Sequence, residues 1–546
     1  MPDDAPFLRR ARRILGKIGV WIGALTVILV LLGGSYLAIR LTDDRPVVYE
    51  SEEDHFKYGS TGGERGWKNH FGFGIPYWIW VALPELFHEY LPDGQPGQGY
   101  AAFGMIYEPD RNPRFDLPIG MSMRRVQGID RVYFNCAVCH TGTVRSAPGA
   151  PPEIILGMPA NTFDLGALAL FFGDAAADWK FRASRIFPTV DALAEQREEV
   201  EPREDGYRPA PLSPVDRWVF RRVAMSMMRE QLLTLTSRLS FVDMASWGPG
   251  RVDTFNPPKA LLGFQMENAP ARELVGNAAL PSVWNQQWKE GMQLHWDGNN
   301  DSVDERNLSA AFGTGATPAT IDAEKLLRTA DWLWDQARPP AFPEERIDRA
   351  LAEEGEAIYQ AQCFHCHGHG APPFRTEGDG TRVGTVIPLA EIGTDRARLD
   401  SYTLELAAAQ NTLYAGFPVD EATCRERPDD REVCYPARFS RFRKTHGYAA
   451  APLDGLWLRA PYLHNGSVPT LAALLEPPDE RPEVFFTGYD VYDYEQVGFV
   501  ANGAEAERLG WRFDTRLPGN GNQGHLYGTD LAPAEKQALV EYLKTF

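Results

Sequence analysis

The 546-residue sequence is poor in cysteine, in histidine and in positive charge. It has 6 Cys and 11 His, and its 55 Lys and Arg against 74 Asp and Glu give a formal net charge of −19. An acidic chain repels phosphates, so we expect no nucleic-acid partner. The sequence also has no phosphate loop or dinucleotide-binding glycine motif, so nothing in it predicts a bound nucleotide. Because single cores stop growing at about 250–300 residues, we expect at least two domains.

Long apolar runs are also scarce, and residues 18–39 form the one run of membrane-spanning length. These 22 residues carry no charge, and a helix rising about 1.5 Å per residue would cross the roughly 30 Å hydrocarbon layer with them. Basic residues between 9 and 17 precede the run, which places the rest of the chain outside the cytoplasm. A cleaved signal peptide is the alternative, but the run is long for one and no small-x-small cleavage site follows. We expect a retained single-pass anchor in the inner membrane.

Four of the six cysteines lie in two copies of one motif. Cys136-Ala-Val-Cys139-His140 and Cys363-Phe-His-Cys366-His367 are both C-x-x-C-H. In this motif the two thiols bond to the vinyl groups of a haem, and the adjacent histidine ligates the iron. Zinc sites and redox dithiols are alternatives, but the first motif has no second Cys/His pair nearby. The sequence predicts two c-type haems with His140 and His367 as iron ligands.

The remaining two cysteines, Cys424 and Cys434, lie in a charged loop with no histidine between them. In the oxidising periplasm we expect them to form a disulfide that closes a small loop. Two free thiols are the alternative.

The order of segments predicts a mainly α protein with two cytochrome-c-like haem domains, long loops and one N-terminal transmembrane helix. In the second domain an amphipathic helix leads into Cys363, and apolar residues recur at helical spacing near the C-terminus. The predicted segments are a basic cytoplasmic tail at 1–17, the anchor at 18–40, a polar linker at 41–60, an N-terminal haem domain with insertions at 61–344, and a C-terminal cytochrome c domain at 345–546.

Beyond the two motifs, residues 459–471 (RAPYLHNGSVPTL), the stretch 519–525 (GNGNQGH) and the terminal Glu-Tyr-Leu-Lys resemble the bacterial dihaem cytochrome c peroxidase superfamily. The closest resemblance is to the dihaem rubber-oxygenase-like c-type cytochromes. It covers most of residues 60–546 and is stronger in the C-terminal part. The resemblance implies that His464 is the second iron ligand of the C-terminal haem, opposite His367. A structural histidine in a turn is the alternative.

The other face of the first haem has several candidate groups. The resemblance implies that this face is open to oxygen or peroxide. We take His295 as a candidate distal group, and Trp284 and Trp296 as candidates for a pocket wall or an electron bridge. An ordinary aromatic core is the alternative for this patch. Met121 and Met123 are alternative ligands through sulfur.

A calcium site is a further hypothesis. Asp297, Asn299 and Asp301 offer alternating oxygen side chains, although the Gly and Glu of an EF-hand loop are missing. The resemblance also implies calcium between the haems. A simple Asn/Asp turn is the alternative.

These features predict a membrane-anchored periplasmic cytochrome that exchanges electrons with a periplasmic or membrane redox partner. The alternative is a dihaem oxidoreductase that activates peroxide or oxygen at the N-terminal haem. A structural subunit with incidental haems is a third hypothesis. No motif names a substrate, so enzyme activity is open.

Replacing Cys136 or Cys363 with Ser should weaken covalent haem attachment at that motif alone, because one thioether bond is lost. We expect haem staining on a denaturing gel to fall by up to about half in each variant. Unchanged staining in both variants would contradict the assignment.

Overall fold

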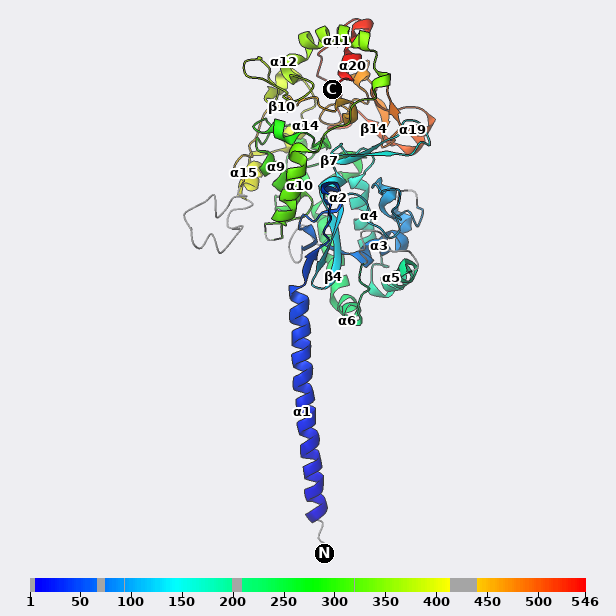
Figure 1. Ribbon diagram of the computed structural model, residues 1–546, viewed down its shortest axis with the longest axis vertical. Coiled ribbons are helices and arrows are strands. Elements are labelled where there is room, and N and C mark those ends of the chain that lie inside the picture. The colour runs from blue at the N-terminus through cyan, green and yellow to red at the C-terminus, as the bar shows by residue number, and fades with distance from the viewer. Residues whose placement is uncertain (1–4, 66–73, 93, 199–208, 319, 413–438) are drawn as a thin grey trace.

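The computed structural model describes residues 5–65, 74–92, 94–198, 209–318, 320–412 and 439–546 (Figure 1). About 46% of the chain is helical and 11% is in strands, in line with the predicted mainly α fold. The predicted disulfide between Cys424 and Cys434 lies outside the described residues.

Helix α1 (Ala5–Thr42) projects from the globular part (Figure 1). Within its stretch Arg13–Thr42, an 18-residue window has a mean hydropathy of 2.3, and none of that window is buried. A helix of this length and composition fits a membrane anchor or a signal sequence.

Residues 41–60 differ from the predicted polar linker. Directly after α1, strand β1 (Asp44–Pro46) pairs antiparallel with β3 (Met121–Val126). Helix α2 (Glu52–Tyr58) follows, and its Phe56 and Tyr58 are buried. Ser51 caps this helix, whose first turn is acidic and whose aromatic side chains are buried in the core, so the segment combines a polar composition with packed structure.

The first core lies around a small sheet and the helices that pack beside it. The sheet has the order β1-β3-β4-β2, with β4 at Ile129–Phe134 and β2 at Ile75–Pro76. The aromatic run after residue 74 forms α3 (Tyr77–Leu86), which packs against α5 (Ala183–Glu198). In this core the ring centres of Trp80 and Tyr100 are stacked 3.5 Å apart.

The remaining elements are short and separated by long loops. The other helices are α4 (Leu165–Ala177), α6 (Pro214–Val219), α7 (Met225–Arg238), α8 (Asn256–Leu261), α9 (Val303–Gly313), α10 (Ala323–Asp335), α11 (Arg349–Gln362), α12 (Phe364–His367), α13 (Leu389–Ile392), α14 (Ala397–Ser401), α15 (Leu404–Thr412), α18 (Leu471–Leu474), α19 (Ala504–Leu509) and α20 (Pro533–Leu543). The strand pairs are β5 (Thr141–Val144) with β6 (Glu153–Leu156), β7 (Arg251–Asp253) with β8 (Asn277–Ala279), β9 (Val386–Pro388) with β10 (Gly447–Ala449), β11 (Val484–Thr487) with β14 (Trp511–Asp514), and β12 (Tyr492–Asp493) with β13 (Gly498–Phe499).

A second core joins the regions around the two C-x-x-C-H motifs. It contains Phe56 and Trp284 from one side of the predicted boundary at residues 344 and 345, and Tyr359 and Leu539 from the other. Asp490 reinforces this contact, because it accepts hydrogen bonds from Thr143 Oγ1 at 2.7 Å and Arg145 Nε at 2.8 Å. The two motif regions are therefore packed together rather than joined by a free linker.

Helices α11 and α20 cross in close contact at Gly355. A Cβ atom added there would lie 2.0 Å from the carbonyl oxygen of Ala538. Near the crossing, the ring of Tyr359 lies 5.3 Å from that of Tyr542 and 4.9 Å from that of Phe546. The C-terminal part thus has the predicted order of an opening helix, the second motif and a closing helix.

The Gly355→Ala substitution should push α11 and α20 apart, because its methyl group would meet backbone rather than a flexible side chain. We expect the free energy of unfolding to fall by about 1–3 kcal/mol, measured by urea denaturation. Gly313→Ala is the control, since nothing lies within 4 Å of the added Cβ. Equal stability of both variants would contradict the close crossing.

Candidate functional site

The first motif lies in a turn between β4 and β5. The short 3-10 helix Cys136–Val138 is capped by Asn135, whose Oδ1 accepts a hydrogen bond from the Ala137 N–H at 3.0 Å. The Nδ2 of Asn135 donates to the carbonyl of Gly59 at 3.0 Å, and this side chain is buried. A buried side-chain amide therefore holds the turn that brings both thiols together. The second motif, by contrast, directly follows helix α11.

The imidazole of His140 is held in one orientation. Its Nδ1–H donates to the carbonyl oxygen of Pro281 at 2.8 Å, which leaves the lone pair of Nε2 free for a metal. Burial lowers the pKa of His140 to about 4. The ring is therefore neutral at neutral pH, which is the form that binds iron.

The second motif follows α11 directly. The N–H groups of Cys366 and His367 both donate to the carbonyl of Cys363, at 3.1 and 3.0 Å, so the two thiols lie on one turn. The chain then bends at Gly368, which has φ +65 and where a Cβ atom would lie 2.1 Å from the Phe374 carbonyl. Tyr359 Oη donates to the Gly368 carbonyl at 2.7 Å and fixes the bend.

His367 repeats the arrangement of His140. Its Nδ1–H donates to the carbonyl oxygen of Ala451 at 2.9 Å. Burial also lowers the pKa of His367. Both motif histidines thus present a neutral imidazole with a free Nε2.

The four motif thiols fit haem attachment better than the alternatives. They are unpaired and partly exposed. Burial raises the pKa of Cys136 to about 11 and that of Cys363 to about 12, whereas redox dithiols need a lowered thiol pKa. In the described part of the chain no group of three or more His, Cys, Asp and Glu forms a metal cluster, so a zinc site has no support there.

The ring of a second histidine, His525, lies close to the ring of His367. The two ring centres lie 6.3 Å apart. Imidazoles on opposite sides of one metal, with metal–nitrogen bonds of about 2 Å, have ring centres roughly 6 Å apart. The Nδ1 of His525 is buried without a hydrogen-bond partner. His367 and His525 would together hold the iron of a haem bound at this motif.

The loop that carries His525 is held by a buried arginine. Arg481 donates to the carbonyls of Asn522, Gly524 and His525, at 2.6, 2.9 and 3.2 Å. Sequence reasoning missed His525 as a ligand, although the glycine-rich stretch 519–525 was part of the resemblance.

His464 has a different environment from the one that the resemblance implied. Its ring is stacked on that of Tyr448, with ring centres 4.0 Å apart. Burial, with Arg398 and Arg251 nearby, lowers its pKa well below the usual value. Among the described residues no ring contact joins it to His367. The geometry thus makes His525 a further candidate for the second imidazole, and the role of His464 stays a prediction.

The indole N–H groups of both candidate tryptophans donate hydrogen bonds to backbone carbonyls. Trp284 is fully buried and its Nε1–H donates to the Leu156 carbonyl at 2.8 Å. The Nε1–H of Trp296 donates to the Ala279 carbonyl at 2.7 Å. These contacts agree with the aromatic-core alternative. Met121 and Met123 likewise lie in β3 and belong to the first core.

Arg306 of α9 lies close enough to both His140 and His295 for its charge to act on each of them. His295 Nδ1–H donates to Asn299 Oδ1 at 2.6 Å, which leaves Nε2 free. Cys136 packs against Ala311 of α9. The Arg306 charge, also on α9, contributes to the lowered pKa values of His140 and His295. Within the described ranges no carboxylate pairs with Arg306, so this cation is free to bind an anion.

The predicted calcium loop uses its oxygens for internal contacts. Asp297 accepts from Arg398 at 2.9 Å, and Asp301 from Arg443 at 3.0 Å. Asn299 accepts from His295. The Oδ2 atom of Asp297 and the Oδ1 atom of Asp301 remain buried without a hydrogen-bond partner, and the calcium site stays a hypothesis.

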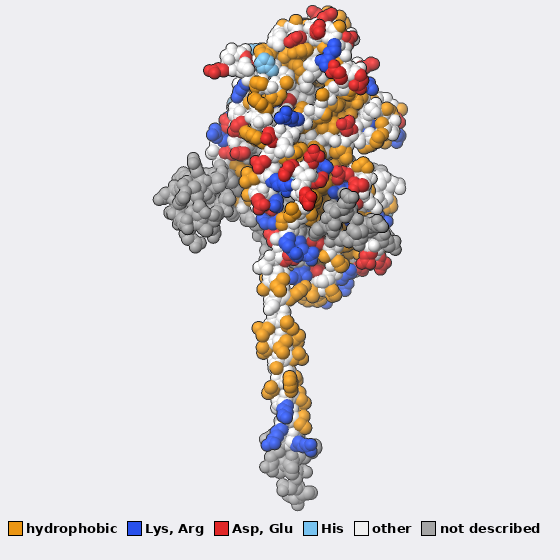
Figure 2. Space-filling model, viewed as in Figure 1, with side chains coloured by type: hydrophobic (Ala, Val, Ile, Leu, Met, Phe, Trp, Pro, Cys, Tyr) orange, Lys and Arg blue, Asp and Glu red, His pale blue; other side chains and the backbone are white. Residues whose placement is uncertain are grey.

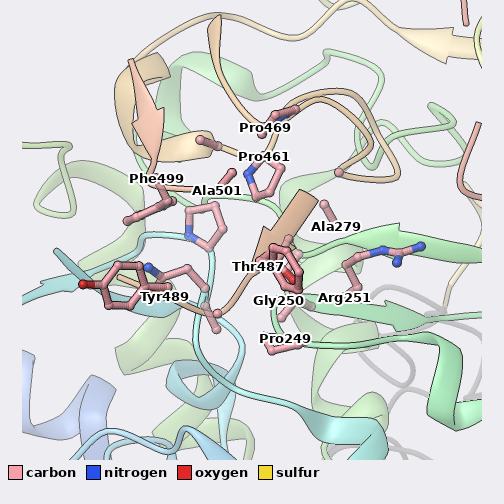
Figure 3. A pocket seen from close by; sticks show the side chains of 18 of the residues that line it. Pro249, Gly250, Arg251, Ala279, Pro461, Pro469, Thr487, Tyr489, Phe499 and Ala501 are labelled. Carbon is pink, nitrogen blue, oxygen red and sulfur yellow. The ribbon is translucent and has the colours of Figure 1, made fainter. Parts of the chain in front are cut away.

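The pocket drawn in Figure 3 is separate from both motifs. Its walls come from residues 249–251, 461–469 and 487–501, where the N-terminal and C-terminal parts of the chain meet. None of the motif cysteines or histidines lines it, and its volume of about 30 Å³ is room for about one water molecule. It is therefore no candidate for the cofactor.

Comparison with known proteins relates part of this chain to c-type cytochromes. Residues 447–486 match the family model "RoxA-like, cytochrome c-like", and this stretch contains Ala451 and His464. The chain is 28% identical to "Uncharacterized protein y4iJ" of Sinorhizobium fredii over 587 aligned residues, covering 88% of this chain and 91% of that protein. It is 34% identical to "Uncharacterized protein y4iM" of the same organism over 300 residues, covering 49% of this chain and 64% of that protein. The match supports a relationship to the cytochrome c family and implies covalently bound haem iron.

Proposed function

We propose that this protein is a membrane-anchored c-type cytochrome with two covalent haems in the periplasm, and that it transfers electrons. The carrying observation is the pair of C-x-x-C-H turns whose histidines, His140 and His367, each donate Nδ1–H to a backbone carbonyl. Haem iron bound at these turns supplies one-electron redox chemistry.

At the second site the residues present support a purely electron-carrying role. His367 and His525 would both hold the iron of a haem bound at this motif, which would then supply electron-transfer chemistry. Tyr359 fixes the turn behind His367, and Arg481 fixes the loop behind His525. These contacts would hold both imidazoles in fixed orientations toward the haem.

A second candidate function, activation of peroxide or oxygen, is supported by the difference between the two sites. In the part of the chain that the structure describes, no second imidazole faces His140 as His525 faces His367. The unpaired cation of Arg306 lies near this motif, since its charge contributes to the lowered pKa of His140. In this role the first site binds the small ligand and the second supplies electrons.

The redox partner is proposed from charge and anchoring. Helix α1 would hold the haem region beside membrane-bound electron donors. The net charge of −19 favours encounter with a basic periplasmic partner, at a rate that falls with ionic strength.

The His525→Ala substitution should convert one of the two haems from low spin to high spin, because its iron loses an axial nitrogen. His464→Ala is the matched variant and should leave the spin state unchanged. Electron paramagnetic resonance of the purified ferric protein measures both. The resemblance predicts the opposite result, so a spin change in His464→Ala alone would contradict the assignment of His525.

The second candidate function predicts that azide binds to one ferric haem and shifts its Soret band. Arg306→Gln should weaken this binding by about 10–100-fold, because a charged contact is worth about 1.5–3 kcal/mol, while Arg306→Lys should retain part of it. Arg396→Gln, which removes an exposed arginine that pairs with Asp400, is the control. No spectral shift at any azide concentration would exclude an open haem and leave electron transfer alone.

A further inference from the structure

An apolar face is exposed on the helical segment that runs from α6 through a π-helical turn (Phe220–Ala224) into α7. Four side chains at helical spacing share this face, with exposed fractions of 50%, 63%, 38% and 48%: Val215, Trp218, Val219 and Val223. The opposite side of the same segment packs into the first core through Phe220 and Met228. The exposed face therefore lacks a partner within the described chain.

This face is tied to the end of the membrane-spanning helix. Arg40, the residue after the last apolar position of the span, forms an ion pair with Asp216 of α6 at 2.5 Å. Arg40 Nε also donates to the carbonyl of Gln127 at 3.1 Å. In Figure 1, α6 lies at the base of the globular part, level with the end of α1. The apolar face is thus located where the hydrocarbon layer would end.

The charges around this face suit lipid headgroups. Arg221 and Arg222 are exposed beside the apolar residues. The segment Pro214–Arg238 carries more arginine than acidic residues, although the whole chain is acidic. Figure 2 shows hydrophobic and basic side chains next to each other at the base of the globular part, around the end of α1. Exposed Trp with flanking Arg is typical of the interface between a membrane and water.

We propose that Val215, Trp218, Val219 and Val223 lie in the outer interface of the same bilayer that α1 spans, with Arg221 and Arg222 on lipid phosphates. This inference rests on the proposed function only in that α1 is retained as an anchor. The Arg40–Asp216 ion pair and the β1–β3 pairing leave no flexible segment between anchor and globular part. Two contacts with the membrane would then fix the tilt of the haem region and the distance of its haems from the bilayer.

A photo-crosslinking experiment tests this surface in the full-length holoprotein. Position 218 is changed from Trp218 to p-benzoylphenylalanine, and the protein is reconstituted in vesicles of phosphatidylcholine and phosphatidylglycerol. The same replacement at Leu509, 52% exposed at the end of α19 and remote from α1 in Figure 1, is the matched control. We expect lipid adducts, measured by mass spectrometry, to be at least about threefold more abundant at position 218.

The intact mass of the reconstituted protein shows whether α1 and both haems are present. It therefore distinguishes a failure of the proposed function from a failure of the membrane contact. Equal or absent lipid adducts at both positions, with α1 retained, would overturn the membrane contact and leave the proposed function standing. An adduct between position 218 and another polypeptide would overturn it in favour of a protein partner. Loss of residues 1–40 would overturn the anchor and the surface together.

Discussion

Two hydrogen bonds to backbone carbonyls set the chemistry of both motifs. Pro281 and Ala451 each accept the Nδ1–H of a motif histidine, His140 or His367. A fixed tautomer and ring direction leave Nε2 as the free donor, which a metal ligand needs. Because these carbonyls lie far along the chain from the motifs, the ligand geometry depends on tertiary packing. The shared core that contains Trp284 holds the two regions in this arrangement.

Around this common plan the two sites differ in what faces the histidine. His525 faces His367 at a separation suited to one iron, whereas the described surroundings of His140 offer a free cation, Arg306, and no second imidazole. The first site would therefore offer a cation to a small anionic ligand, whereas the second would offer a second imidazole. The same asymmetry separates the two candidate functions, because a pure electron carrier needs no open position on either iron.

Local patterns predicted local features. The spacing of Cys136 and His140 was sufficient for haem attachment, since two thiols and a ligand must share one turn. An uncharged run likewise predicted α1, because the length and composition of one continuous segment are enough to indicate a membrane-spanning helix. His525 could not be predicted, because its pairing with His367 depends on a loop held by Arg481. The backbone carbonyls that orient an imidazole could not be predicted either, because any residue type carries a carbonyl. The buried aromatic side chains of α2 could not be recognised, because acidic residues surround them in the sequence.

The proposed electron-transfer function depends most on two imidazoles that share one iron. A crystal structure of the haem-loaded protein, with iron located by anomalous scattering, tests this directly. We predict two iron peaks, one beside His140 and one between the rings of His367 and His525, with His464 still stacked on Tyr448. A second peak between His367 and His464, or no iron beside the Cys363 motif, would contradict the account.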